Sequence, residues 1–526
     1  MNVNGDCVTN YQNISIQHPV YMVLRKAWIY WPSLLLSAVM VPFAFAPYYQ
    51  YWLAPLFLAE LLIYQAIRPE WQVRSAYFWA LTAYTSLLYW IDIALHDIAA
   101  LPQYLAWPLT LLLPAYLAFY PAAVFWLLGK FRLSPIIRNT VLFPLLWTLA
   151  EFVRERALTG FGWGAIGYTQ IADSPLAGFA PVGGIFLVTL VTVATGAWLA
   201  MLLLVRRRLK KIGYGIALVG IWVLGALLLR HNFTQPDGTQ ATIALGQGNI
   251  AQSLKWNVNS LQPTLQRYLD QVASTRANIV ILPETAIPAM RQDMPSEQLE
   301  LFTQMAKHQG SALAVGIPQY TDDGKGYLNA VVNLTSSSDS TEPSYYAKNH
   351  LVPFGEYIPI PSLMGWIYQL MDIPLAGFSV GGSAQKPLQM ANQRIGFNIC
   401  YEDGFGDELI AAAKQSSLLA NISNMAWYGR SHAMHQHLQQ SQARALETGR
   451  YMVRATNTGM TAIINPKGKI VAQLDPDIAA VLEGNIQGYQ GNTPYMYVGS
   501  SWPMAIICLL LVSIFWLYGR FRVRSL

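Results

Sequence analysis

Charged residues are scarce in this 526-residue chain: Asp, Glu, Lys and Arg make up 12% of it, whereas hydrophobic residues make up 53%. A soluble globular protein carries roughly 25% charged residues. The shortage excludes a wholly soluble protein and predicts a membrane protein with a soluble part. The length leaves room for two or three domains.

Acidic residues in particular are rare outside 231–502. There the chain holds 18 Lys and Arg against 8 Asp and Glu, whereas residues 231–502 hold 16 against 20. A basic excess beside apolar runs is typical of membrane flanks. The net charge of +6 therefore gives no reason to expect a nucleic-acid partner.

Cysteine is also rare, with three residues far apart: Cys7, Cys400 and Cys508. No CxxC or Cys/His zinc spacing occurs, and three clustered histidines do not share one helical face: His432, His435 and His437. We therefore expect no metal and no cofactor. With one cysteine, the soluble part cannot form an internal disulfide.

Long apolar runs, in contrast, are plentiful. We expect a polar tail at 1–24, a membrane domain with seven transmembrane helices at 25–230, a soluble domain at 231–502, and an eighth transmembrane helix with a basic tail at 503–526. The apolar runs lie at about 27–46, 50–67, 76–95, 104–128, 139–153, 177–205, 212–230 and 503–519.

The loops between these runs carry Lys and Arg on alternate sides. The connections near 47–49 and 96–103 have none, whereas the connection at 206–211 has five. Only the loop 154–176 breaks the alternation, with Arg154 and Arg156. By the positive-inside rule, both termini are expected in the cytoplasm and the soluble domain on the opposite side.

Residues 231–502 read as short strands alternating with helices, which predicts one α/β domain. Strands are expected at 241–246, 278–282, 312–316, 328–334, 394–399, 417–422, 451–456 and 460–465. Helices are expected at 261–275, 296–308, 405–414 and 433–449.

Three chemically distinct side chains each follow a predicted strand of this domain: Glu284, Lys348 and Cys400. Separately they have ordinary interpretations as a turn carboxylate, a surface lysine and a buried packing thiol. Together at strand ends they form a base, an anion stabiliser and a nucleophile. An ammonium beside the thiol would also lower the thiol pKa.

Several neighbouring residues are candidates for supporting roles. Glu356 lies eight residues after Lys348. It is either a positioning partner for Lys348 or a structural hydrogen-bond acceptor. Asn424 and Trp427 follow the strand 417–422 and predict a pocket wall, although Trp427 also fits a core position. The run 363–378 is too short to span a membrane and too apolar for an ordinary loop, so a core helix and a lipid-facing arm fit it equally.

The spacing of Glu284, Lys348 and Cys400 resembles the Glu-Lys-Cys triad of the nitrilase superfamily. With the apolar runs and the segment Gln247-Gly248-Asn249-Ile250…Lys255-Trp256, the chain resembles the apolipoprotein N-acyltransferase family over nearly its full length. The resemblance implies a polytopic α-helical membrane domain plus an α/β nitrilase-like αββα sandwich domain. It also implies a bacterial inner-membrane protein whose catalytic domain is periplasmic.

The same resemblance implies a reaction. An acyl chain passes from a phospholipid, through a Cys400 thioester, to the α-amino group of the N-terminal diacylglyceryl-cysteine of an apolipoprotein. Glu284 would be the base, Lys348 the oxyanion stabiliser and Cys400 the nucleophile. Further functional positions of the family match Trp256, Glu356, Tyr401 and Glu402.

Two positions depart from the family pattern. Gly162 stands where Gly-Phe-Pro-Trp has proline, and Met425 replaces the acidic residue of Asn-Asp-Ala-Trp. Neither departure touches the triad.

Two other functions remain open at this stage. The triad alone also fits a membrane-tethered nitrilase-type amidase, in which water replaces the amine as acceptor. A transporter with an inactive nitrilase-like domain is the other alternative; the intact triad and the lack of ionisable residues inside most spans argue against it.

The expected topology gives the first prediction. Reporter fusions after residue 208 and after residue 235 should report opposite sides of the membrane, because one apolar run, 212–230, separates them. Reporters at both positions that give the same side would contradict the topology.

Overall fold

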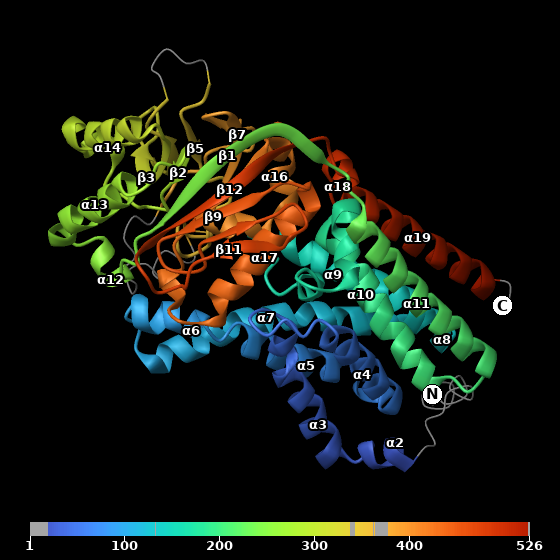
Figure 1. Ribbon diagram of the computed structural model, residues 1–526. Helices are drawn as coiled ribbons and strands as arrows, with labels where there is room; N and C mark the ends of the chain where they lie inside the picture. The colour runs from blue at the N-terminus through green and yellow to red at the C-terminus, as the bar shows by residue number, and fades with distance from the viewer. Residues whose placement is uncertain (1–18, 132, 337–341, 361, 363–376, 524–526) are drawn as a thin grey trace. The chain divides into compact units, whose positions relative to one another are not determined.

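The computed structural model describes residues 19–131, 133–336, 342–360, 362 and 377–523. The chain divides into two compact units (Figure 1). The membrane unit runs to Tyr89, resumes over Pro108–His231 and resumes again from Val498. The sandwich unit comprises Trp90–Trp107 and Asn232–Tyr497. Of the predicted apolar arm, only Gly377 and Phe378 lie within the described residues.

The membrane unit is helical, and a helix occupies each of the eight expected runs. Its main helices are α2 (Pro19–Leu24), α3 (Ala27–Val39), α4 (Leu53–Ile67), α5 (Gln72–Leu87), α7 (Gln103–Lys130), α9 (Phe143–Arg156), α10 (Ala180–Leu204), α11 (Arg208–Arg230) and α19 (Ser501–Val523). Short helical segments between α7 and α9 are α8 (Pro135–Ile137) and a π-helical turn, Arg138–Leu142, whereas α6 (Ile91–Ile93) belongs to the sandwich unit.

Five stretches among the described residues are long and apolar enough to cross a membrane. A sixth is possible if Pro69–Leu87 and Ile91–Ile98, bent by 57° at their break, form one span. Leu53–Ile67 and Ser501–Phe515 are shorter apolar helices. The number of spans, seven plus one, stays a prediction.

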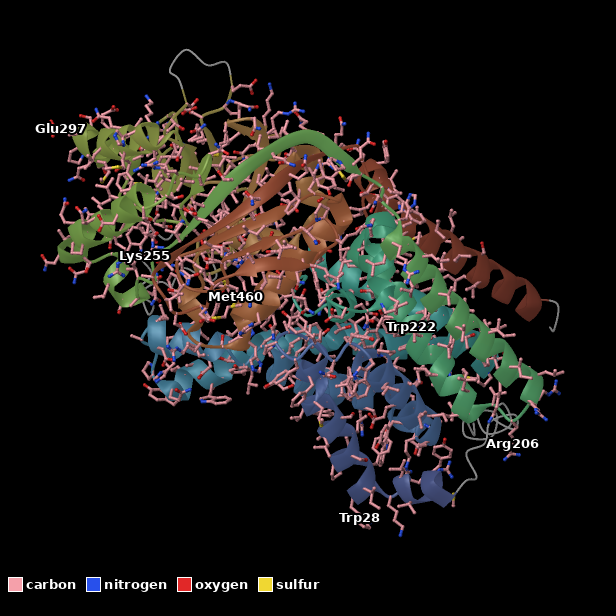
Figure 2. The ribbon with its side chains drawn as sticks, in the orientation of Figure 1. Trp28, Arg206, Trp222, Lys255, Glu297 and Met460 are labelled. Carbon is pink, nitrogen blue, oxygen red and sulfur yellow. The ribbon has the colours of Figure 1, made fainter. Side chains whose placement is uncertain are left out.

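Helices α9 and α11 show how the sequence forms this unit. Pro144 lies near the start of α9, directly after the π-helical turn Arg138–Leu142, and the helix runs on through both over Pro135–Arg156. This apolar run therefore stays helical despite the proline, with the missing N–H next to the π-turn. In α11, where Trp222 lies (Figure 2), only 6% of the most apolar stretch is buried. Such an apolar, unburied helix is suited to a lipid environment.

The sandwich unit contains two six-stranded sheets. The first has the order β12 (Ala480–Gln490), β1 (Gln235–Gln247), β2 (Ile279–Ile281), β3 (Ala312–Tyr320), β4 (Tyr327–Asn333) and β5 (Tyr345–Ala347). The second has the order β11 (Ile470–Gln473), β10 (Ala462–Ile464), β9 (Met452–Thr456), β8 (Leu418–Ser423), β7 (Gln393–Ile399) and β6 (Leu388–Met390).

Alternation along the strands builds two hydrophobic layers around the first sheet. Ile243 and Leu245 of β1 face the second sheet and pack with Phe397 and Ile399 of β7. Ala244, between them, faces the opposite way and packs with α13 (Val258–Ala273) and α14 (Ser296–Gln309). Successive side chains of a strand point to opposite faces, so one strand serves both layers.

Helices cover the outer faces of the sandwich (Figure 1). α13 and α14 lie over the first sheet, and α16 (Gly406–Ala413) and α17 (His432–Thr448) lie over the second. The unit also contains the shorter helices α12 (Gln252–Lys255) and α18 (Pro494–Val498). The predicted αββα sandwich is confirmed.

The eight predicted strand ranges and four predicted helices of this unit are all present, and the short strand expected just before Lys348 is β5, but β6, β11 and β12 were not predicted. Strands β6 and β11 are short, and β12 carries Gly484, Gly488 and Glu483, which weaken its apolar pattern. Strand β12 is stabilised by long antiparallel pairing with β1, a tertiary contact that its own sequence does not predict.

Candidate active site

Glu284 lies just after β2, with its carboxylate buried at 7% exposure. Thr285, the next residue, has φ of 50°, so the chain turns sharply at this point. The turn lies against Gly316 of β3, where an added Cβ would lie 2.1 Å from the Pro283 carbonyl oxygen. Glycine at 316 thus permits the close approach that holds Glu284 in place.

Lys348 follows β5 and is 1% exposed. Its Nζ lies 2.9 Å from Oε1 and 2.8 Å from Oε2 of Glu356, and 3.7 Å from Oε1 of Glu284. Burial alone would lower the pKa of Lys348, but the carboxylates of Glu356 and Glu284 outweigh it and raise this pKa. The ammonium is therefore a fixed positive charge.

Two asparagines hold the carboxylate of Glu284. Asn329 Nδ2 donates to Glu284 Oε1 at 2.8 Å and to Glu356 Oε1 at 3.0 Å. The backbone N–H of Asn424 donates to Glu284 Oε2 at 2.9 Å. The Asn424 side chain donates to Gln252 Oε1 at 2.7 Å and accepts from Asn457 Nδ2 at 3.0 Å. Asn424 thus orients Glu284 through its backbone.

Cys400 begins a 3-10 turn, Cys400–Gly404, directly after β7. Its φ of 54° is left-handed, a strained conformation for a residue with a side chain. Burial and then the charge of Glu284 raise the thiol pKa to about 12, although Lys348 lowers it as predicted. The resting group is a thiol, so nucleophilic attack requires a base.

Glu402 connects the turn Cys400–Gly404 to the segment that follows Lys348. Its carboxylate accepts hydrogen bonds from the backbone N–H of Ile399 at 2.6 Å, of Asn349 at 2.7 Å and of His350 at 3.0 Å, and from the Tyr346 hydroxyl. Burial raises the pKa of Glu402 to about 7, against the effect of these donors. Asn349 and His350 directly follow Lys348, and Ile399 directly precedes Cys400. Glu402 therefore fixes the position of the Lys348 segment relative to the Cys400 turn.

The other predicted residues lie nearby but make weaker connections. The Tyr401 ring packs edge-on against Phe405 at 5.1 Å between centroids. Trp256 and Trp427 are partly exposed, and neither donates a hydrogen bond to the triad within the described part of the chain. Tyr428, next to Trp427, packs edge-on against Trp90 at 4.7 Å.

Lys255 is a site residue that the sequence reasoning missed. It closes the short helix α12, is labelled in Figure 2, and is 5% exposed. Its Nζ donates to the backbone carbonyl of Glu284 at 3.0 Å. Burial lowers the pKa of Lys255 to about 8, against the opposing effect of the Glu284 carboxylate. In the sequence, the signal for Lys255 is its position next to Trp256, in the segment that carries part of the family resemblance.

A buried polar group behind Cys400 was also missed: His437, Arg454 and Asp403. The sequence singles out His437 only as part of a histidine cluster with His432 and His435. Arg454 is the charged residue of the buried strand β9, and a charged residue in a central strand is the signal that points to it. Among the described residues, no group of three His, Cys, Asp or Glu is arranged to hold a metal ion.

Residues 242–495 match the carbon-nitrogen hydrolase family, and residues 37–198 match the apolipoprotein N-acyltransferase N-terminal domain. The chain is 57% identical over 501 residues to an apolipoprotein N-acyltransferase of Neisseria meningitidis serogroup B, covering 94% of this chain and 98% of the relative. This chain belongs to the apolipoprotein N-acyltransferase family.

Other relatives carry the same name. The identity is 51% over 481 residues with a protein of Chromobacterium violaceum, covering 91% of this chain and 92% of the relative. It is 40% over 473 residues with one of Nitrosomonas europaea, covering 89% and 93%. The predicted family is confirmed, and with its apolar helices the chain is a membrane-bound acyltransferase.

The buried ammonium of Lys255 gives a prediction about pH. Its pKa of about 8 lies below the ordinary 10.5, so between these values unfolding takes up a proton. The stability of the wild type relative to Lys255→Met should therefore rise through this window, by at most about 1.4 kcal/mol per pH unit. Thermal unfolding of both proteins in detergent measures the difference.

The exposed Lys414 provides the matched control. Wild type and Lys414→Met should keep a constant difference in Tm over the same pH range, because the Lys414 side chain is exposed to water in the folded and the unfolded state alike. A constant difference for Lys255→Met as well would show that Lys255 keeps its ordinary pKa.

Proposed function

We propose that this protein transfers an acyl chain from a phospholipid, through a thioester on Cys400, to the α-amino group of an N-terminal diacylglyceryl-cysteine. The single observation that carries the proposal is the buried cluster in which Glu284 and the Lys348 ammonium lie 3.7 Å apart beside the Cys400 turn. The relatives' name supports N-acyl transfer to an apolipoprotein. The phospholipid donor follows from the family resemblance and from the membrane unit.

The first half-reaction forms the acyl-enzyme. Glu284 takes the Cys400 proton as Sγ attacks the ester carbonyl carbon, and the Lys348 ammonium stabilises the resulting oxyanion. When this intermediate collapses, the ester C–O bond breaks and the leaving alkoxide takes the proton from Glu284. The products are a lysophospholipid and an acyl thioester. The raised thiol pKa makes this base indispensable.

In the second half-reaction, the amine is the nucleophile and the Cys400 thiolate is the leaving group. The lipoprotein amine attacks the thioester carbonyl carbon, and Glu284 removes a proton from the nitrogen. The C–S bond breaks, Cys400 recovers its proton from Glu284, and an amide is released. The hydrogen bonds of Glu356 and Asn329 hold the Lys348 and Glu284 side chains in their relative positions through both steps.

We also propose the location of the reaction. The protein lies in a bacterial inner membrane with both termini cytoplasmic and the sandwich unit periplasmic. The alternation of basic loops supports this orientation, and Arg206, which Figure 2 labels, belongs to the most basic inner connection.

The thioester gives the test. Enzyme given phospholipid without lipoprotein should accumulate an adduct of one acyl chain on Cys400, measured by intact mass and removed by neutral hydroxylamine. Cys400→Ala and Glu284→Gln should abolish the adduct. Lys348→Met should slow its formation by on the order of 10²–10³-fold, as expected when an oxyanion donor is lost.

Cys508 supplies the matched control, since it is a free and exposed thiol. Cys508→Ala should be acylated like the wild type. An adduct that persists in Cys400→Ala would place the acyl group elsewhere. Free fatty acid released by the wild type, with no adduct, would favour the hydrolase alternative.

A further inference from the structure

The backbone carbonyl of Cys400 is held by two buried side chains. His437 Nε2 lies 2.9 Å from this oxygen, and Asn421 Nδ2 donates to it at 3.2 Å. His437 comes from α17 and Asn421 from β8, so the contacts fix the cysteine turn to two elements of the fold. They act at the residue whose φ of 54° is unfavourable for a side chain.

The partners of His437 determine which ring nitrogen carries the proton. Arg454 Nη2 lies 2.7 Å from Nδ1, and a guanidinium has only donors, so Nδ1 is the acceptor. A carbonyl oxygen is only an acceptor, so Nε2 carries the proton toward Cys400. The Met425 sulfur lies 3.1 Å from Nδ1, but thioether sulfur is a weak acceptor and does not reverse this assignment.

Arg454 is itself held rigidly. Its Nη1 donates to Asp403 Oδ2 at 3.1 Å, to Asn421 Oδ1 at 3.0 Å and to Ser441 Oγ at 2.9 Å. All four side chains are 1% exposed or less. Burial, followed by the charge of Arg454, lowers the pKa of His437 well below its ordinary value. The imidazole therefore stays neutral and keeps one hydrogen-bond pattern.

The direction of the Cys400 carbonyl sets the direction of the next N–H. The peptide unit joining Cys400 to Tyr401 is planar, and in a trans unit the carbonyl oxygen and the following N–H point opposite ways. With the oxygen turned toward His437, the Tyr401 N–H points away from α17. Rotation of this peptide would move both the thiol and this N–H.

We propose that His437 is a positioning residue for acylation: held by Arg454 with its proton on Nε2, it clamps the Cys400 carbonyl and so fixes the thiol and the Tyr401 N–H. The clamp rests on the proposed acylation of Cys400. It involves no proton transfer, and His437 does not touch the reacting atoms.

Two substitutions at 437 separate the donor from the acceptor. In His437→Asn, the side-chain oxygen replaces Nδ1 toward Arg454, but no N–H reaches Cys400. In His437→Gln, the amide nitrogen replaces Nε2, so the donor to Cys400 is kept. We expect His437→Asn to slow acylation of Cys400 by phospholipid on the order of 10²-fold, since small misplacements of reacting groups cost this much. His437→Gln should recover most of the rate.

Rates are read by intact mass, with Tm and iodoacetamide alkylation of Cys400 measured in parallel. Alkylation forms no oxyanion, so His437→Asn should slow it far less than acylation. Equal acylation rates in all three proteins overturn the clamp alone, as does a His437→Gln rate as low as that of His437→Asn. A wild type that forms no adduct overturns the proposed function, and with it the clamp.

If His437→Asn does not fold, the tautomer is measured directly in the wild type. Selective ¹⁵N-histidine NMR in detergent at neutral pH should show His437 protonated at Nε2 and not at Nδ1. Assignment of its resonance uses His437→Gln. A proton on Nδ1, or on both nitrogens, removes the described geometry and overturns the proposal.

Discussion

The site depends on one constraint: an ammonium is buried where the two sheets meet, and it must be paired. Removing Lys348 from water costs several kcal/mol unless carboxylates surround it. Glu356 supplies the close partner at 2.8 Å, and Glu284 lies farther away at 3.7 Å. The closer carboxylate neutralises the lysine, which in the proposed mechanism leaves Glu284 available as the base. In the proposed mechanism, the same fixed charge of Lys348 also stabilises the negative charge that develops on the oxyanion.

The cysteine turn is built around the same requirement for fixed geometry. Glu402 joins it to the residues after Lys348, and Asn421 and His437 hold its carbonyl. Such an arrangement keeps Cys400 at a left-handed φ that an isolated turn would avoid. The unfavourable φ of Cys400 is thus offset by hydrogen bonds from several elements of the fold.

Local patterns predicted most of the sandwich and the three central residues. Glu284, Lys348 and Cys400 are visible because each directly follows a regular strand. Strand β12 was not visible, because its pairing with β1 joins residues far apart in sequence. Lys255 and Arg454 were missed for a similar reason: their burial is a tertiary property. Their sequence neighbours do not show it.

The family match and the geometry address different questions. The relatives' name supports the transfer of an acyl chain to a lipoprotein, whereas the contacts indicate how a buried thiol is activated. Lys348 favours acyl transfer and hydrolysis equally, because both pass through an oxyanion. The fate of the thioester is what separates the two reactions.

The most direct measurement is therefore a chase of the isolated acyl-enzyme. Cys400 is first loaded from a phospholipid with a labelled acyl chain, and a diacylglyceryl lipopeptide is then added with excess unlabelled phospholipid. The account predicts that label leaves Cys400 and appears in the peptide amide at the same rate. Label released as free fatty acid at a rate independent of the lipopeptide, or an amide formed only from unlabelled donor, would contradict it.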